Sequence, residues 1–244
     1  MAALEFLRPD WAAPARIHAA MTTRPGGVSR DPYASLNLAQ HVGDDPVAVS
    51  ENRRRLRAAL ELPAEPAWLE QVHGARVAIL PSRADGPADG VVTAERGTVC
   101  AVLVADCLPV FLASKGGDRV GIAHAGWRGL AAGVIEATIA ALDVDASDLV
   151  AWLGPSIGPG AFEVGGDVRE ALLEGDPGAA DAFRAGRGDR WLADLPALAR
   201  RRLAAAGVTA VTGGCVCTHS DTARFYSYRR DGATGRMAAL AWLA

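Results

Sequence analysis

Residues 98–129 read TVCAVLVADCLPVFLASKGGDRVGIAHAGWRG, and the alternation of apolar runs with polar breaks in this segment indicates the architecture. The apolar runs predict three strands, over Thr98–Val104, Val110–Ala113 and Arg119–Ala125. Because the runs are nearly continuous, they are typical of strands that are buried on both faces. Cys107 follows the first run and His124 lies at the end of the third, so reactive side chains are expected where buried strands end.

The rest of the chain mixes strands and helices in an irregular order. Further strands are predicted over Ile17–Thr23, Val77–Leu80, Val150–Leu153, Val208–Thr212 and Phe225–Tyr228. Helices are predicted over Pro46–Leu60, Gly129–Leu142, Gly166–Glu174 and Leu195–Ala206, and a loop over Glu174–Arg190. This mixture favours an α+β fold with a layered sheet core, and no linker divides residues 1–244 into more than a single domain.

Composition and motifs narrow the classes of function. The chain has 244 residues and a formal net charge of -3, so it lacks the overall basic excess of a protein that binds nucleic acid through phosphates. No GxGxxG motif follows a predicted strand, and the sequence contains no GxxxxGK[ST] motif, so nothing indicates a nucleotide cofactor. Glu5, Arg8 and Asp10 interrupt the apolar core that a signal peptide needs, and no apolar run reaches the length of a membrane span. We expect a cytoplasmic protein with reduced thiols and neither nucleic-acid nor membrane partners.

Three candidate metal ligands lie at the ends of predicted strands. His73 precedes Gly74 in QVHG, Cys107 lies in ADCLPV, and His124 opens HAGWRG. Two imidazoles and one thiolate suit Zn²⁺, and a set of three protein ligands leaves a fourth position for water. A Cys/His nucleophile pair is an alternative, and three unrelated buried side chains are another.

A set of short motifs that occur together between about Thr22 and Trp242 resembles the pattern of a known family. The motifs are TTRPGGVS, PYASLNL, HVGDDP, ENR, QVHG, ADG, ADCLPV, HAGWRG, FEVGGDV and FYSYRRDGATGRMA. In this order they resemble the YfiH/DUF152 family, whose members have been called polyphenol-oxidase-like proteins, purine nucleoside phosphorylases and peptidoglycan editing factors. The resemblance implies a single-domain α-β-β-α sandwich, in which mixed β-sheets are flanked by helices.

The same resemblance implies a function and a metal. It implies Zn²⁺ held by His73, Cys107 and His124, which would also be the catalytic residues. The implied activity is phosphorolysis of adenosine, inosine, guanosine and methylthioadenosine, together with deamination of adenosine by zinc-activated water. The alternatives are an amidase that edits a peptidoglycan precursor, a laccase-like copper oxidoreductase, and a metal-binding protein without catalysis. Copper oxidation ranks low because a multicopper centre needs many histidines, and the chain has 5.

Four polar residues are assigned to binding of the nucleoside and phosphate: Arg24, Asn37, His41 and Arg128. The Arg24 guanidinium would hold an anion in a bidentate way or brace the Pro-Gly-Gly turn beside it. His41 would contact substrate or belong to the capping loop before the helix at Pro46. Arg128 follows His124 by four residues at a predicted helix start, which favours an anion site near the metal.

Two further pairs of residues each have two alternative roles. Asp89 or Asp106 would orient a ligand histidine through its second nitrogen or serve as an acid or base, and a structural role is favoured for Asp106. Cys215 and Cys217 alternate along a predicted strand in GCVCT. They are expected to be buried, with a second soft-metal site as the less favoured alternative.

Overall fold

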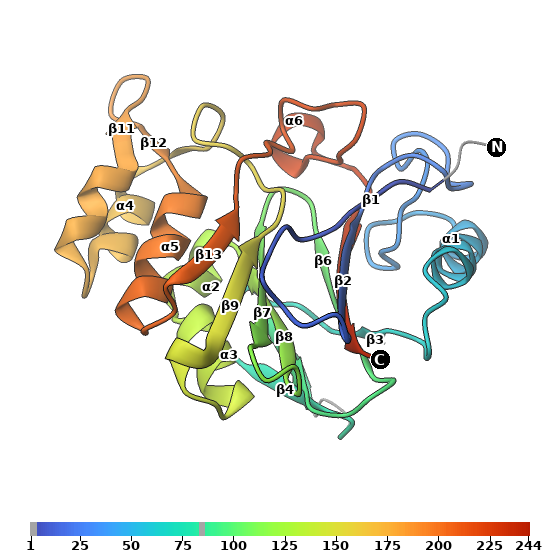
Figure 1. Cartoon of the computed structure of the whole chain (residues 1–244). Helices are drawn as coiled ribbons and strands as arrows, with labels where there is room; N and C mark the ends of the chain where they lie inside the picture. Colours follow the sequence, from blue (N-terminus) through green and yellow to red (C-terminus); the bar gives the residue numbers. More distant parts are fainter. Residues whose placement is uncertain (1–3, 83–85) are drawn as a thin grey trace.

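The computed structural model describes residues 4–82 and 86–244, which form two large β-sheets packed face to face (Figure 1). The first sheet has the strand order β1-β2-β14-β6-β3. Its strands are β1 (Phe6–Leu7), β2 (Ile17–Thr22), β14 (Met237–Leu243), β6 (Val99–Val104) and β3 (Ala67–Trp68). Strand β14 pairs antiparallel with both β2 and β6, so the two ends of the chain meet in this sheet.

The second sheet has the strand order β13-β9-β7-β8-β5-β4. Its strands are β13 (Ala210–Gly213), β9 (Leu149–Leu153), β7 (Leu108–Ser114), β8 (Val120–Ala125), β5 (Gly90–Thr93) and β4 (Val77–Leu80). The two outer pairs, β13 with β9 and β4 with β5, are parallel, whereas the central pairs are antiparallel. Every residue of β7 and β8 is buried, as the continuous apolar runs predicted.

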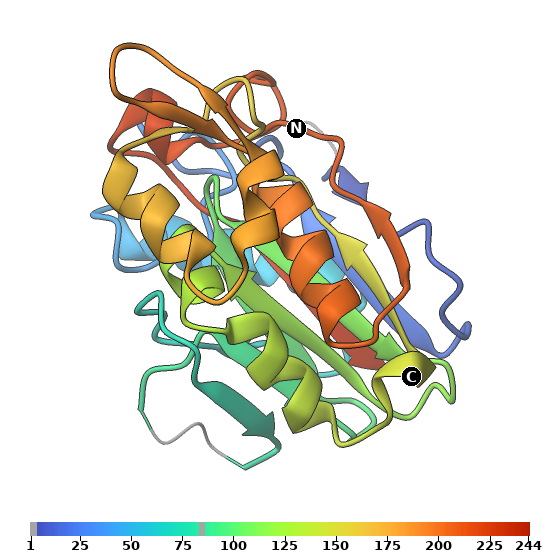
Figure 2. The same cartoon turned by 90° about the vertical axis from the view of Figure 1, so that its left-hand side faces the viewer.

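Helices cover the outer face of each sheet (Figures 1 and 2). Helix α1 (Pro46–Ala59) packs against the first sheet, where Leu56 joins a core cluster with Ala101 and Leu240. The second sheet is covered by α2 (Trp127–Ala131), α3 (Val134–Leu142), α4 (Gly166–Leu173) and α5 (Leu195–Ala205). A third cluster fills the space between the sheets, so the expected α-β-β-α sandwich of mixed sheets is confirmed.

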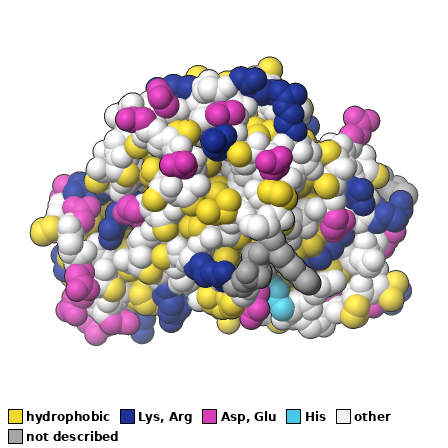
Figure 3. Space-filling view, turned by 90° about the horizontal axis from the view of Figure 1, so that it is seen from below, with side chains coloured by type: hydrophobic (Ala, Val, Ile, Leu, Met, Phe, Trp, Pro, Cys, Tyr) yellow, Lys and Arg dark blue, Asp and Glu magenta, His cyan; other side chains and the backbone are white. Residues whose placement is uncertain are grey.

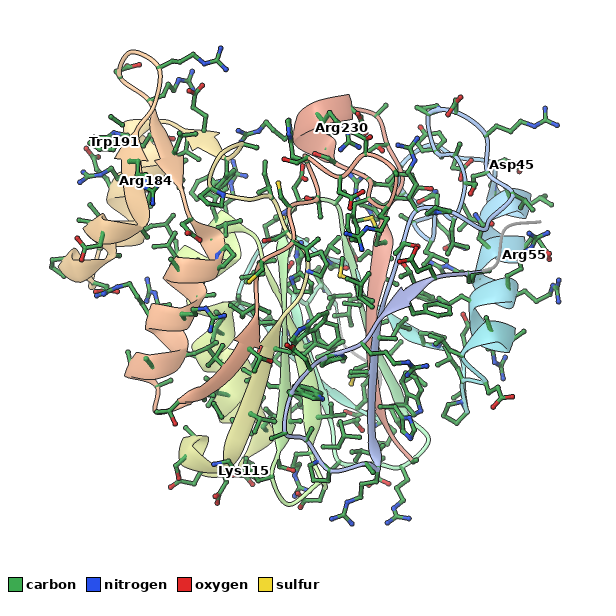
Figure 4. All side chains as sticks on the ribbon, turned by 45° about the horizontal axis from the view of Figure 1, so that its top comes forward. Asp45, Arg55, Lys115, Arg184, Trp191 and Arg230 are labelled. Atoms are coloured by element: carbon green, nitrogen blue, oxygen red, sulfur yellow. The ribbon has the colours of Figure 1, made fainter. Side chains whose placement is uncertain are left out.

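Several smaller elements complete the fold. A three-stranded sheet is formed by β10 (Glu163–Val164), β12 (Trp191–Ala193) and β11 (Phe183–Ala185). The other short elements are the 3₁₀ helices η1 (Ala146–Asp148) and η2 (Pro177–Ala182) and the helix α6 (Tyr228–Asp231). In Figure 4, Arg230 marks α6 at one end of the sheets, and Lys115, between β7 and β8, marks the opposite end.

The structure corrects several predicted elements. The helix predicted over Gly129–Leu142 is two helices, because Gly133 adopts a left-handed conformation with φ of 87° between α2 and α3. Residues Phe225–Tyr228 form no strand: the Ser227 hydroxyl caps α6 by accepting the Arg230 N–H at 3.2 Å, which turns the chain into a helix. The predicted loop Glu174–Arg190 contains η2 and β11.

Surface charge is mixed on the face seen in Figure 3. Lys and Arg side chains alternate with Asp and Glu around its margin, and hydrophobic side chains lie between them. Among the described residues, no helix is long and apolar enough to cross a membrane.

Candidate metal centre

His73, Cys107 and His124 converge at the end of the sandwich that α6 covers. His73 lies in the connection from β3 to β4, Cys107 in the connection from β6 to β7, and His124 on β8. One ligand atom from each residue lies within 4.8 Å of the other two. Cys107 Sγ is 3.8 Å from His73 Nε2, and the two imidazole centroids are 4.9 Å apart. His124 is buried, Cys107 half-buried and His73 exposed, so the group opens to solvent on the His73 side.

A buried carboxylate holds two members of this group. Asp89 accepts hydrogen bonds from the backbone N–H groups of Val72, His73 and Gly74 at 3.1, 2.9 and 2.7 Å. Its Oδ1 also lies 2.8 Å from His124 Nδ1. These contacts hold His73 at a φ of 60°, a conformation that non-glycine residues rarely adopt, and leave Nε2 of His124 free for a ligand.

The electrostatics of the centre favour a thiolate beside protonated imidazole. Burial raises the pKa of the Cys107 thiol, but the charge and hydrogen bonding of His124 and His73 outweigh burial and lower it to about 6. Burial lowers the pKa of His124, but Cys107 and Asp89 raise it to about 9. For Asp89, burial raises the pKa, and hydrogen bonds from His124 and Gly74 bring it below its usual value. The negative charges of Cys107 and Asp89 therefore stabilise the proton on His124. A metal ion bound here would take the place of that proton.

Asp106 holds the neighbouring loop and is turned away from the cluster. Its Oδ1 accepts the Thr218 hydroxyl at 2.6 Å, and its Oδ2 accepts the Ser227 hydroxyl at 2.9 Å and the Arg229 N–H at 2.7 Å. Its backbone oxygen accepts the Ile157 N–H at 2.9 Å. The favoured structural role of Asp106 thus agrees with its contacts, whereas Asp89 makes the contact that orients a histidine.

Gly126 allows the strand carrying His124 to pass close to the other two side chains. A Cβ at this position would lie 2.8 Å from Cys107 Sγ and 3.1 Å from His73 Cδ2. Any larger residue would therefore push the ligand atoms apart. The backbone turns into α2 directly after this glycine.

The four predicted substrate residues have different surroundings. Half-buried Arg24 donates its Nε–H to the Ala34 carbonyl at 2.6 Å. Buried Asn37 is fully engaged: its amide nitrogen donates to Ala39 and Asp44, and its oxygen accepts backbone N–H groups of Ala39 and Arg236. His41 lies at the surface, where partial desolvation of its ring and the charges of Arg236 and Arg53 lower its pKa. The guanidinium of exposed Arg128 lies over the Trp127 ring at 4.4 Å.

Arg236 is a cation near the centre that the sequence interpretation did not single out. It directly precedes β14, and Met237 pairs with Val104, three residues before Cys107. Burial lowers the pKa of Arg236, and the charges of Cys107 and Asp106 raise it, so the guanidinium is within electrostatic reach of the centre. Its Nη1 donates to the carbonyls of Thr234 and Gly235. The only sequence signal was its place in SYRRDGATGRM, and nothing local indicated that β14 would bring it here.

Residues 18–244 match the family described as multi-copper polyphenol oxidoreductase laccase. A purine nucleoside phosphorylase of Pseudomonas aeruginosa is 54% identical over 239 residues, covering 98% of each chain. The purine nucleoside phosphorylase YfiH of Escherichia coli is 52% identical over 241 residues, covering 98% of this chain and 99% of that one. The chain belongs to the YfiH/DUF152 family.

Two solved structures have the same fold as this chain. A Neisseria meningitidis protein assigned to DUF152 superposes with a TM-score of 0.94 and 48% identity, and the match covers 98% of both chains. YlmD from Geobacillus stearothermophilus superposes with a TM-score of 0.93 and 34% identity, covering 100% of this chain and 97% of that one. The resemblance drawn from the motifs is confirmed over nearly the whole chain.

Proposed function

We propose that this chain is a zinc-dependent purine nucleoside phosphorylase that also deaminates adenosine. Adenosine, inosine, guanosine and methylthioadenosine are its proposed substrates, and residues 1–244 act as a single domain. The names of the two relatives described above support the phosphorylase activity. The pairing of β2 with β14, from opposite ends of the chain, supports a single domain.

The observation that carries the proposal is the convergence of His73, Cys107 and His124. Two ligand bonds of about 2.0 and 2.3 Å at a tetrahedral angle separate nitrogen and sulfur by about 3.5 Å. The separation of 3.8 Å between His73 Nε2 and Cys107 Sγ fits a shared ion with little movement. The mixed nitrogen and sulfur donors favour Zn²⁺, and a set of three protein ligands is typical of catalytic rather than structural zinc.

The residues around the ion have separate tasks. A Zn²⁺ held here would supply a Lewis acid, which polarises a substrate oxygen or brings the pKa of water toward neutrality. Asp89 fixes the Nδ1 tautomer of His124 and the backbone of His73, so both imidazoles present Nε2 to the same point. Exposed His73 lies on the open side, where substrate would enter.

Phosphorolysis also needs a cation for the attacking phosphate. A phosphate oxygen forms the bond to C1′ of the ribose, the bond from C1′ to the purine nitrogen breaks, and a proton neutralises the departing base. Arg24, Asn37, His41 and Arg128 are the proposed substrate residues from the sequence. We add Arg236, because its guanidinium is half-buried within electrostatic reach of Cys107 and its Nε and Nη2 have no acceptor among the described residues.

A turnover assay with a phosphate control tests this function. Zinc-loaded protein should release adenine and ribose 1-phosphate from adenosine when phosphate is present. Without phosphate it should release inosine and ammonia. Absence of turnover of all four nucleosides, in protein with one zinc per chain, would contradict the proposal.

A peptidoglycan-editing amidase is the second candidate, and one observation favours it. The lowered pKa of Cys107 beside a protonated His124 is what a cysteine nucleophile and its base require. Alkylation separates the two functions. A ligand thiolate should react with iodoacetamide only after chelation of the metal, whereas a nucleophile should react in the metal-loaded protein as well.

Copper oxidation remains the weaker alternative. Of the 5 histidines, only His73 and His124 belong to a group of three or more potential ligands within the described part of the chain. One such group supports a single ion rather than a multicopper centre.

All 4 cysteines are free, which supports the proposed cytoplasmic location.

A further inference from the structure

One cavity is lined by two thiols and by none of the three candidate metal ligands. It is open to solvent, has a volume of about 520 Å³, and is lined by residues that include Cys215, Cys217, Ser220 and Arg224. Cys215 is exposed and Cys217 half-buried, so the expectation that both are buried strand residues is wrong. Gly213 and Gly214, with φ of 77° and 80°, end strand β13 and turn the chain out of the sheet before Cys215.

Cys217 is surrounded by hydrogen-bond donors. The Gly158 N–H donates to its Sγ at 3.2 Å, and the Ser220 hydroxyl donates at 3.4 Å. Gly158 can approach because it has no side chain: a Cβ there would lie 3.1 Å from Sγ. Burial raises the pKa of this thiol, but the bonds from Ser220 and Gly158 outweigh burial and lower it. Donors of this kind stabilise a thiolate, which is the reactive form of cysteine.

Cys215 has the opposite surroundings. Its Sγ lies 3.7 Å from the Gly213 carbonyl oxygen, to which the S–H group donates. The cavity therefore holds Cys217, whose sulfur accepts two hydrogen bonds, and Cys215 two residues away in a segment without strand pairing.

We propose that Cys215 and Cys217 form a redox dithiol that reduces a small hydroperoxide. The Cys217 thiolate attacks the outer peroxide oxygen. A sulfur–oxygen bond forms, the oxygen–oxygen bond breaks, and the alkoxide or hydroxide that leaves takes a proton from water. The Cys215 thiol then attacks the sulfur of the sulfenic acid, forms a disulfide and releases water. The hydroperoxide is thus reduced by two electrons, which the two thiols supply.

The spacing permits this disulfide. Two residues of extended chain span at most about 7 Å between Cα atoms, and disulfides bridge Cα separations of about 4.4–6.8 Å. Because Cys215 is exposed, its side chain can turn from Gly213 toward Cys217 without displacing the core.

The position of the pair also connects it to the candidate metal centre. Thr218, which follows Cys217, donates its hydroxyl to Asp106, the residue before Cys107. The Ser156 carbonyl accepts the Thr218 N–H, and the Ser156 N–H donates to the Val216 carbonyl, so Ser156 pairs with the residues before and after Cys217.

Peptide mapping tests the proposal without reference to nucleoside turnover. Trypsin cleaves after Arg202 and Arg224 and leaves Cys215 and Cys217 in one peptide, separate from Cys100 and Cys107. After brief exposure of the metal-loaded protein to hydrogen peroxide and alkylation, peptide 203–224 should have lost two hydrogen atoms and carry no alkyl group. Unchanged alkylation of both cysteines in this peptide would overturn the proposal.

Two matched variants test the separate roles. In Cys215→Ser, no disulfide should form, and dimedone should label Cys217 as the sulfenic acid. In Cys217→Ser, Cys215 should remain alkylatable under the same exposure. Equal oxidation rates of the remaining cysteine in the two variants would contradict the assignment of Cys217 as the attacking thiolate.

Discussion

Asp89 Oδ1 lies 2.8 Å from His124 Nδ1, and both side chains are buried. The same carboxylate accepts three backbone N–H groups from residues 72–74, including that of His73. One side chain thus fixes two potential ligands that are 51 positions apart in the sequence (124 − 73). The three side chains are thus held in place without a bound ion.

Asp89→Asn should weaken zinc binding by about ten- to a hundred-fold, because the amide loses the charge that orients His124 and one of the acceptor oxygens. Competition with a chromogenic chelator measures the affinity. Asp145→Asn is the matched control, since Asp145 only caps η1 at the surface and should leave the affinity unchanged. Equal affinities of the Asp89→Asn protein and the unmodified protein would show that Asp89 serves the fold alone.

Metal analysis should find one zinc per chain, and His73→Ala, Cys107→Ala or His124→Ala should each remove it. Loss of one of three protein ligands leaves too few donors for a tightly held ion. Elemental analysis of dialysed protein gives the stoichiometry. His219→Ala is the control, because His219 does not belong to the ligand group. Retention of zinc in any of the three ligand variants would remove that residue from the site.

Zinc affinity should rise with pH. Because the pKa of His124 is raised to about 9, the metal must displace its proton at neutral pH. One released proton gives about a tenfold gain in affinity per pH unit up to about pH 9, and no further gain above it. Below about pH 6, where Cys107 also binds a proton, the dependence should steepen. Chelator competition across this range is the measurement, and a flat profile from neutral pH to about pH 9 would contradict a protonated His124.

Arg236→Met and Arg128→Met should separate the two proposed cations. If Arg236 binds phosphate, its loss should lower phosphorolysis by about ten- to a hundred-fold and change deamination much less, as expected for a lost charge-assisted contact. Exposed Arg128 should then give the smaller effect. Rates of adenine and inosine formation at several phosphate concentrations provide the test. A larger loss of phosphorolysis in Arg128→Met than in Arg236→Met would assign phosphate binding to Arg128, as the sequence predicts.

Leu240→Ala should destabilise the protein by about 2–5 kcal/mol, because it deletes buried methyl groups from the centre of β14. Leu240 is fully buried in the cluster beneath α1. Chemical denaturation measures the change. Val47→Ala, at an exposed position on α1, should change stability by less than about 0.5 kcal/mol.

Local sequence patterns were sufficient to predict the central strands of the fold. The runs that form β6, β7 and β8 are continuous and apolar, so their strands and the reactive residues at their ends followed from residues 98–129. Strand β14 was missed because MAALAWL has no alternation that separates a buried strand from a buried helix. Its partners, β2 and β6, lie far away in the sequence.

Long-range pairing also explains what could not be predicted around the centre. Arg236 approaches Cys107 only because Met237 pairs with Val104. Asp89 was one of two candidates for orienting a histidine, and the choice depended on β5 pairing with β8, which places Gly90 opposite Ala123. The cysteines at 215 and 217 were assigned to a strand because their alternation fits one, but the two left-handed glycines before them end the pairing.

Two of the three candidate ligands lie where the chain crosses from one sheet to the other. Cys107 follows β6 of the first sheet and precedes β7 of the second, and His73 lies between β3 and β4 in the same way. An ion bound there would tether the two layers, so that sliding of one sheet over the other breaks coordination. The layers would then separate only together with loss of the ion. At a free-metal concentration a hundred times its Kd, this tether raises the free energy of unfolding by about 2.7 kcal/mol.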